Sequence, residues 1–342
     1  MKRLIFTTAL IGSLLLQNCG PTNHTDSQKN IADANPMDYA ETITANELKD
    51  LLYTYASDEF EGRETGEPGQ KKAVAFLRDF YEDHNIKSPL DTTYFQTVPE
   101  SYFAANSGIK ASENVLAYIE GSTKPDEIIV VSAHLDHVGV REDGDVYNGA
   151  DDDGSGTVAV LQIADAFNEA LKNGYRPQRS ILFLHVTGEE KGLYGSRYYA
   201  EHPVFPLENT VVDLNIDMIG RQDFDHPDND NYVYLIGSSM LSTELHDISE
   251  AVNKKTVNLE LDYKYDDPND PNRFYYRSDH YNFAKNGVPV IFYFNGVHED
   301  YHKVTDSPDK INYPLLAKRA KLVFLTAWEL ANRPERIVVD KK

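Results

Sequence analysis

The chain is almost devoid of cysteine: Cys19 is the single one among 342 residues. A domain that follows this residue has no internal disulfide, no thiol nucleophile and no thiolate to hold a metal. Any metal bound by such a domain must therefore be held by histidine, aspartate and glutamate side chains.

Positive charge is also scarce, since Lys and Arg number 33 against 55 Asp and Glu and leave a formal net charge of −22. A surface of this kind repels phosphate backbones, so we expect no nucleic-acid partner. The Gly-x-Ser-x-Gly elbow of serine hydrolases is absent as well, and Ser155 in "DGSGT" offers only a weak substitute.

The apolar run at the N-terminus, residues 4–16, is too short to span a bilayer and follows Lys2 and Arg3. This pattern is typical of a secretory signal peptide, which we expect over residues 1–18. The run ends in "LLLQNC", which resembles a bacterial lipobox with Cys19 as the lipidated residue. We therefore expect an exported lipoprotein of the cell envelope, whose membrane contact is only its lipid anchor. A plain signal peptide cleaved nearby is the alternative.

Residues 19–40 are polar and aperiodic, which predicts a flexible tether, and a single catalytic domain is expected over residues 41–335. Thr44 and Glu47 match a capping box at the start of its first helix. Apolar runs typical of strands then alternate with helical patterns; the runs are 114–121, 127–134, 180–188, 211–220, 232–239 and 288–296. This alternation predicts an α/β fold, a three-layer sandwich with a mostly parallel, mixed central sheet flanked by helices.

Two acidic loops, residues 223–231 and 266–272, lie between these elements. Calcium binding is one interpretation of them. Solvated turns rich in Asp, Asn and Pro are the more common one.

Polar residues that can bind a metal recur just after the predicted strands, at the edge where open α/β sheets form their sites. They are His134, Asp136, Asp151, Asp152, Asp153, Glu189, Glu190, Asp217 and His302. Imidazole and carboxylate ligands without sulfur suit zinc. A pair of metals needs a bridging carboxylate, and a free carboxylate beside the pair can act as general base.

The segments "AHLDH", "NGADDDGSG", "TGEE", "NIDM" and "YHKVTD" occur in the order and approximate spacing of the co-catalytic di-zinc aminopeptidases of clan MH. The chain resembles this family from about Phe60 to its last helix. The family includes secreted bacterial leucyl aminopeptidases and, more distantly, glutamate carboxypeptidases and glutaminyl cyclases. The resemblance implies hydrolysis of N-terminal residues from peptides with a free N-terminus, with two zinc ions per chain.

The resemblance also implies a ligand set for the two zinc ions. His134, Asp151 and Asp217 would hold one zinc, and Asp151, Glu190 and His302 would hold the other. Asp151 would then be the bridging ligand.

Further roles follow from the same resemblance. Glu189 would be the general base, and Asp136 would hydrogen-bond His134 and fix its tautomer. A cis peptide bond would join the bridging aspartate to Asp152, which is otherwise a supporting residue. Tyr275 would help to stabilise the oxyanion.

Other functions remain open at this point. The stretch "HEDYH", residues 298–302, satisfies the H-E-x-x-H pattern of zincins, but that motif requires a helix, whereas here a strand and a glycine precede it and Pro308 follows. A glutaminyl cyclase-like enzyme, a carboxypeptidase of the same fold and an inactive binding protein are further alternatives. The paired glutamates and the intact "GADDD" favour two metals and hydrolysis.

Overall fold

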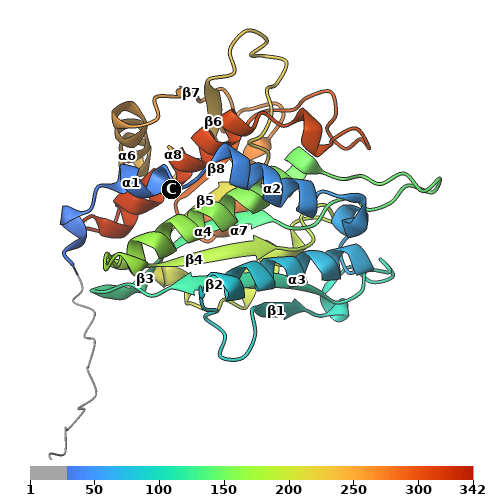
Figure 1. Ribbon diagram of the computed structural model, residues 1–342, viewed down its shortest axis with the longest axis horizontal. Coiled ribbons are helices and arrows are strands. Elements are labelled where there is room, and N and C mark those ends of the chain that lie inside the picture. The colour runs from blue at the N-terminus through green and yellow to red at the C-terminus, as the bar shows by residue number, and fades with distance from the viewer. Residues whose placement is uncertain (1–28, 342) are drawn as a thin grey trace, which may run out of the picture.

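The computed structural model describes residues 29–341, in which eight strands form one sheet flanked by helices (Figure 1). The signal peptide expected over residues 1–18 and the lipid anchor expected at Cys19 lie outside the described residues. The strands are β1 (Phe95–Val98), β2 (Ser112–Ile119), β3 (Lys124–His134), β4 (Arg179–Val186), β5 (Thr210–Ile216), β6 (Tyr232–Ile236), β7 (Glu260–Asp262) and β8 (Val290–Phe294).

The strand order is β1-β2-β4-β3-β5-β8-β6-β7. The four central strands β4, β3, β5 and β8 run parallel to one another, while β1, β2 and the β6–β8 pair introduce antiparallel neighbours. Every residue of β4 is buried, which explains the unbroken apolar stretch at residues 181–184, because helices cover both faces of a parallel sheet. The predicted mixed, mostly parallel sheet is confirmed.

The helices form the two outer layers of the sandwich. They are α1 (Pro36–Ala40), α2 (Ala45–Tyr55), α3 (Pro68–Asp83), α4 (Gly156–Lys172), α5 (Tyr194–Glu201), α6 (Thr243–Lys255), α7 (His280–Ala284) and α8 (Tyr313–Asn332). Helix α8 contacts α1, α2, α4 and α6 on one face, whereas α5 packs with α7 on the other.

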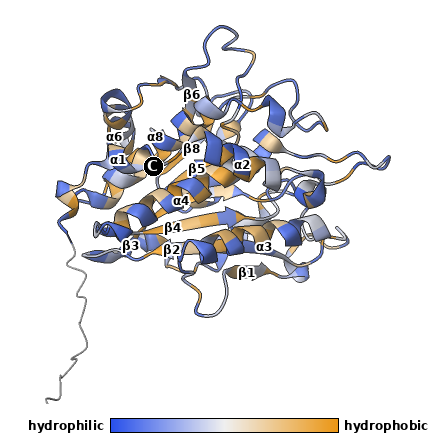
Figure 2. Cartoon of the chain, viewed as in Figure 1, coloured by the Kyte–Doolittle hydropathy of each residue, from blue (hydrophilic) through white to orange (hydrophobic). Residues whose placement is uncertain are grey.

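Strand β3 shows how the two cores are separated. Its residues Ile129 and Val131 join the large core under α4 and α8, while Val130 joins a second core with Tyr199 of α5 and Phe283 of α7. Alternate residues of a strand point to opposite faces, so this strand serves both cores. Figure 2 shows hydrophobic residues concentrated in the central strands and hydrophilic residues in the outer loops.

Local sequence signals agree with the observed helix boundaries. The hydroxyl of Thr44 accepts a hydrogen bond from the Glu47 amide at 3.2 Å and donates one to the Glu47 carboxylate at 2.7 Å, so this predicted cap forms. Helix α4 ends shortly before Gly174, whose φ of +87° permits the left-handed stop that glycine favours.

The domain extends beyond the predicted boundaries of 41 and 335. Residues expected in the tether form a short 3-10 turn (Ile31–Asp33) and α1, and Tyr39 stacks on Trp328 with ring centroids 5.6 Å apart. Beyond the last helix, Ile337 is buried. These ends are mostly polar in sequence. The sequence therefore did not predict that their few apolar side chains are buried against the core of the domain. None of the described helices is long and apolar enough to cross a membrane.

Both acidic loops are built as turns that satisfy their own backbone. Asp223 accepts hydrogen bonds from the amides of Asp225 and His226, and Asp270 accepts them from Asn272 and Phe274. Such bonds are how aspartate stabilises an irregular loop without a bound cation.

Candidate metal centre

The candidate ligands lie at the carboxyl ends of the four parallel central strands. His134 is the last residue of β3, Asp217 directly follows β5, and Glu189 and Glu190 follow β4 within four residues of its end. His302 lies in the loop after β8. Because β4, β3, β5 and β8 are neighbours in the sheet, residues that are distant in sequence meet at one edge.

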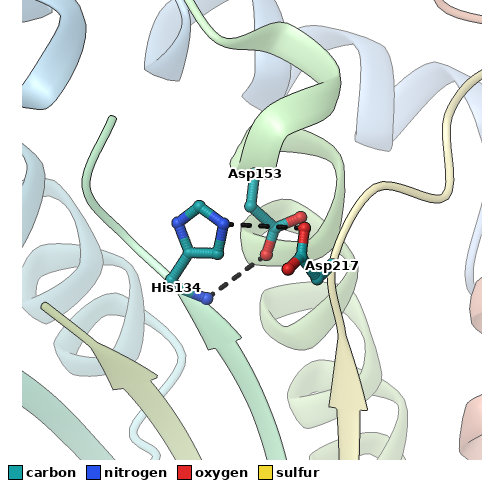
Figure 3. Close-up of side chains that lie close together, drawn as sticks. All are labelled: His134, Asp153 and Asp217. Carbon is teal, nitrogen blue, oxygen red and sulfur yellow. Dashed lines mark hydrogen bonds and ion pairs between the residues drawn. The ribbon is translucent and has the colours of Figure 1, made fainter. Parts of the chain in front are cut away.

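The first group of ligands surrounds the imidazole of His134. Its Nε2 lies 3.3 Å from Asp152 Oδ1 and 3.6 Å from Asp217 Oδ1, and Figure 3 shows the ring facing Asp217. Its Nδ1 lies 3.0 Å from the backbone carbonyl oxygen of Asp136, which can only accept a hydrogen bond. This contact assigns a proton to Nδ1 and directs Nε2 at the carboxylates, so Nε2 is the atom that would bind a metal.

The second group surrounds His302. Its Nε2 lies 3.1 Å from Asp152 Oδ2 and 3.1 Å from Glu190 Oε2. The two oxygens of Asp152 therefore face two different histidines, which is the arrangement required of a bridging carboxylate. Asp152 and Glu190 are almost fully buried, and buried carboxylates in contact need cations to offset their repulsion. The donor set and its charge fit two zinc ions.

Asp151, predicted as the bridging ligand, is directed elsewhere, so that prediction is corrected by one residue. Its Oδ1 accepts a 2.7 Å hydrogen bond from the Gly220 amide, and its Oδ2 lies 3.0 Å from His298 Nε2. Burial by itself would raise the pKa of Asp151, but the hydrogen bonds from His298 and the Gly220 amide outweigh burial and lower it. Asp151 holds the loop to His298 and Gly220, and Asp152, predicted as a supporting residue, lies between the two groups of candidate ligands.

The cis peptide bond is displaced in the same way, because it joins Asp152 to Asp153 and not Asp151 to Asp152. Asp153 lies near His134 and Asp217, as Figure 3 shows. Its two oxygens accept hydrogen bonds from the backbone amides of His134, Gly156 and Met218 at 3.0–3.2 Å. These bonds occupy the carboxylate, so Asp153 positions the loop and the strand ends around it.

Asp306, at the end of the "YHKVTD" segment, holds the aspartate loop from the opposite side. Its carboxylate accepts hydrogen bonds from the amides of Asp151 at 3.0 Å and Asp152 at 3.2 Å. Burial and the nearby Asp151 raise the pKa of Asp306 to about 6. The sequence predicts no role for Asp306, because a bond between residues 155 apart leaves no local pattern.

Glu189 lines the same cavity as Asp152, Asp217 and His302. Its backbone amide donates a 3.1 Å hydrogen bond to Asp136 Oδ1. Burial raises the pKa of Glu189 well above its ordinary value, and the negative charge of Asp217 adds to this effect. A half-buried carboxylate beside the ligands and outside both ligand groups is suited to general base chemistry.

The predicted contact of Asp136 with His134 exists, but through a different atom. The backbone carbonyl of Asp136 meets the imidazole, whereas its carboxylate lies 3.9 Å from Nδ1. That carboxylate accepts bonds from the Thr65 hydroxyl at 2.7 Å and from the Glu189 amide. Asp136 therefore orients the ligand with its backbone and the candidate base with its side chain.

Tyr275 lies outside the set of residues that line the cavity, contrary to its predicted oxyanion role. Its ring packs against Tyr276 and His280, with centroids 5.3 and 5.7 Å away. Tyr301 lines the cavity instead and stacks on His302 with ring centroids 4.0 Å apart. Burial and the carboxylates of the site, Asp152 first among them, raise the pKa of Tyr301 and keep its hydroxyl protonated.

A third histidine, His137, also belongs to the site. Its Nδ1 lies 2.8 Å from Glu190 Oε1 and 3.8 Å from Asp152 Oδ2, and the side chain is fully buried. The position of His137 three residues after His134 was the available signal, but histidine is common at strand ends. Gly149 makes room for it, because a Cβ there would lie 2.5 Å from the His137 ring.

The zincin alternative conflicts with the local geometry. Residues 298–302 form turns and no helix, and the two histidines of the motif face different carboxylates. His298 is bonded to Asp151, while Glu299 is largely exposed and lies 3.3 Å from Arg221. A zincin requires both histidines on one helical face with the glutamate beside them.

Comparisons with known proteins find relatives that are named as proteases or aminopeptidases. A probable zinc metalloprotease of Pyricularia oryzae is 28% identical over 269 residues, which cover 66% of this chain and 51% of that protein. This chain therefore spans about half the length of that relative. A probable leucine aminopeptidase of Arthroderma otae is 27% identical over 268 residues, covering 69% of this chain and 71% of that protein.

Solved structures show the same fold. The LapA aminopeptidase of Legionella pneumophila superposes with a TM-score of 0.69 at 20% identity, over 95% of this chain and 81% of that one. A glutaminyl cyclase of Porphyromonas gingivalis does so with a TM-score of 0.64 at 16% identity, over 83% and 97%. A profile of Peptidase family M28 matches residues 114–327, a segment that begins in β2 and ends in α8 and contains all of the candidate ligands. By this match over more than half of its length, the chain belongs to Peptidase family M28.

Proposed function

We propose that the protein is a metallo-aminopeptidase that uses two zinc ions to remove N-terminal residues from peptides. His134, Asp152 and Asp217 would hold one ion, and Asp152, Glu190 and His302 the other. The observation that carries this proposal is the orientation of Asp152, whose two carboxylate oxygens face His134 and His302 separately at 3.3 and 3.1 Å.

Zinc bound at these positions would supply a Lewis acid for the scissile carbonyl and lower the pKa of water. Glu189 would accept the proton of the attacking water and deliver it to the departing amine. The Tyr301 hydroxyl, held protonated, would donate a hydrogen bond to the carbonyl oxygen as negative charge develops on it. Asp136 would keep Glu189 in place through the backbone amide.

The cavity supports the choice of a free N-terminus and an apolar first residue. Its acidic end, with Glu189 and Asp217, suits a positively charged amine. The apolar part of its lining is formed by Met218, Phe274, Phe292, Phe294 and Val297. An apolar side chain on this wall is removed from water while the amine stays near the carboxylates.

A panel of aminoacyl-nitroanilides and N-blocked peptides tests this proposal, with zinc content measured on the same samples. We expect hydrolysis only of substrates with a free amine. Glu189→Gln should lower kcat about 10³-fold with zinc still near two per chain. The matched control is Glu299→Gln, since Glu299 is exposed and outside the cavity. Loss of zinc with little change in rate for the Glu189 variant would contradict its assignment as base.

A glutaminyl cyclase-like reaction is the second candidate, because a glutaminyl cyclase shares the fold over most of this chain. The same panel separates the two activities when a peptide with N-terminal glutamine is included. Release of free glutamine identifies an aminopeptidase, whereas release of ammonia without cleavage of the peptide identifies a cyclase.

We also propose that the protein is exported and anchored in the cell envelope by a lipid on Cys19. The basic start, the short apolar run and the lipobox-like "LLLQNC" support this proposal. Labelling with a radioactive fatty acid tests it: the full chain should incorporate the label, and Cys19→Ser should not. Incorporation into both chains would contradict the anchor.

A further inference from the structure

One cationic side chain lines the cavity together with the carboxylates and the apolar wall, namely Arg277. It lies one residue after a short 3-10 turn, Phe274–Tyr276, and is exposed to solvent. Its guanidinium rests over the Phe274 ring at 4.8 Å from the centroid. The contact with an aromatic face holds the cation at the wall of the cavity.

Within residues 29–341, no carboxylate lies within 4.0 Å of the Arg277 guanidinium. The chain has 55 acidic and 33 basic side chains, so acidic groups outnumber the basic groups that could pair with them. The carboxylates that line the cavity with Arg277 are the candidate metal ligands Asp152 and Asp217 and the candidate base Glu189. The N–H donors of the Arg277 guanidinium are therefore available to a substrate that enters the cavity.

Arg273 lies on the other side of the same turn and provides a comparison for Arg277. Its guanidinium rests over the Tyr276 ring at 4.9 Å, and it is exposed in the same way. Arg273 is not among the residues that line the cavity. The two arginines therefore differ in access to the site and share their local setting.

We propose that Arg277 is a specificity residue that binds a carboxylate of the substrate by paired N–H donors. This rests on the proposed peptidase function and narrows its substrate class. The carboxylate has two possible sources, an acidic side chain on the first residue or the C-terminal carboxylate of a dipeptide. A guanidinium suits either, because its planar fork matches the two oxygens of a carboxylate.

Equilibrium binding by calorimetry tests the proposal in the zinc-loaded Glu189→Gln protein, which retains its ligands without turnover. One ligand pair is Leu-Gly and its C-terminal amide, and the other is glutamyl-nitroanilide and glutaminyl-nitroanilide. We expect at least about tenfold tighter binding of the carboxylate-bearing member in one pair, which identifies the source. Adding Arg277→Gln should reduce that ratio to about one, while Arg277→Lys should retain part of it.

Arg273→Gln in the same background is the matched control and should leave the ratio unchanged. Equal binding within both pairs, or a ratio that survives Arg277→Gln, overturns the proposal. Thermal melts confirm that each variant is folded. Turnover by the wild-type protein is measured separately, so a protein that shows the binding preference but hydrolyses none of the four ligands refutes the peptidase function and leaves the role of Arg277 intact.

Discussion

Two neighbouring aspartates, Asp151 and Asp152, allow a sharp test of the bridging assignment. Each can be replaced by asparagine, which keeps the shape of the side chain and removes its charge. Asp152→Asn takes away an oxygen ligand shared by both groups of candidate ligands. Asp151→Asn leaves those groups untouched and disturbs the contacts with His298 and Gly220.

The size of the Asp151 effect follows from its partners. The Asp300 amide donates to His298 Nδ1 at 3.2 Å, so the His298 proton is on Nε2 and points at Asp151. Both oxygens of Asp151 thus face N–H donors, and either orientation of an asparagine amide places its own NH₂ group against one of them. Loss of one charge-assisted bond and burial of an unpaired donor together cost about 3 kcal/mol. A domain of this size should then melt about 5 °C lower or more.

The assay measures zinc content, kcat/KM on an aminoacyl-nitroanilide and the melting temperature for each variant. We expect Asp152→Asn to lose at least one zinc and about 10³-fold in kcat/KM, because a bridging ligand serves both metals. Asp151→Asn should keep both zinc ions and most of its activity below its lower melting point. If Asp151→Asn loses zinc while Asp152→Asn retains it, the reasoning from the loop geometry is wrong.

Three further predictions concern other parts of the site and the core. Gly149→Ala should destabilise the protein by about 3 kcal/mol and lower its zinc affinity, since a Cβ at this φ of +52° would collide with His137; an unchanged melt and zinc content would contradict this. Burial raises the pKa of the Asp213 carboxyl to about 8 in the folded protein. The unfolded chain loses this proton near pH 4, so the stability of the protein falls as the pH rises from about 4 to about 8. Asp213→Asn should therefore gain about 3–4 kcal/mol relative to wild type between pH 5 and pH 8 in denaturant titrations, and a constant difference would refute the shift. Tyr301→Phe should lower kcat about tenfold or more whereas Tyr275→Phe stays within about twofold, and the reverse order in steady-state kinetics would restore the oxyanion role to Tyr275.

Much of the fold could be predicted because its signals are local. Residues 181–184 are apolar without alternation, as in a strand covered on both faces, and Thr44 and Glu47 predict a helix start that forms as expected. The ends of the domain were misjudged because Tyr39 and Ile337 are isolated apolar residues in polar surroundings. Their burial depends on surfaces elsewhere in the fold, such as Trp328 for Tyr39.

The sequence by itself determined the chemistry available to this protein. A domain without cysteine must use imidazole and carboxylate ligands, and the positions of His134, Glu190 and Asp217 after strands place them at one edge of a parallel sheet. Motif order then pointed to the family. These conclusions need only residue types and their spacing from elements that local pattern defines.

Only the tertiary structure decided which of three consecutive aspartates faces the metals. Asp151, Asp152 and Asp153 are chemically identical, so their directions depend on the backbone of the loop and on the groups that hold it. Those groups are Asp306, His298 and the amides of Gly220 and Met218, all 65 or more residues away. These bonds hold the carboxylates of Asp151 and Asp153 in place, so that the Asp152 carboxylate lies between His134 and His302. A run of identical residues contains no local signal for this choice, because the choice depends on partners that only folding brings close.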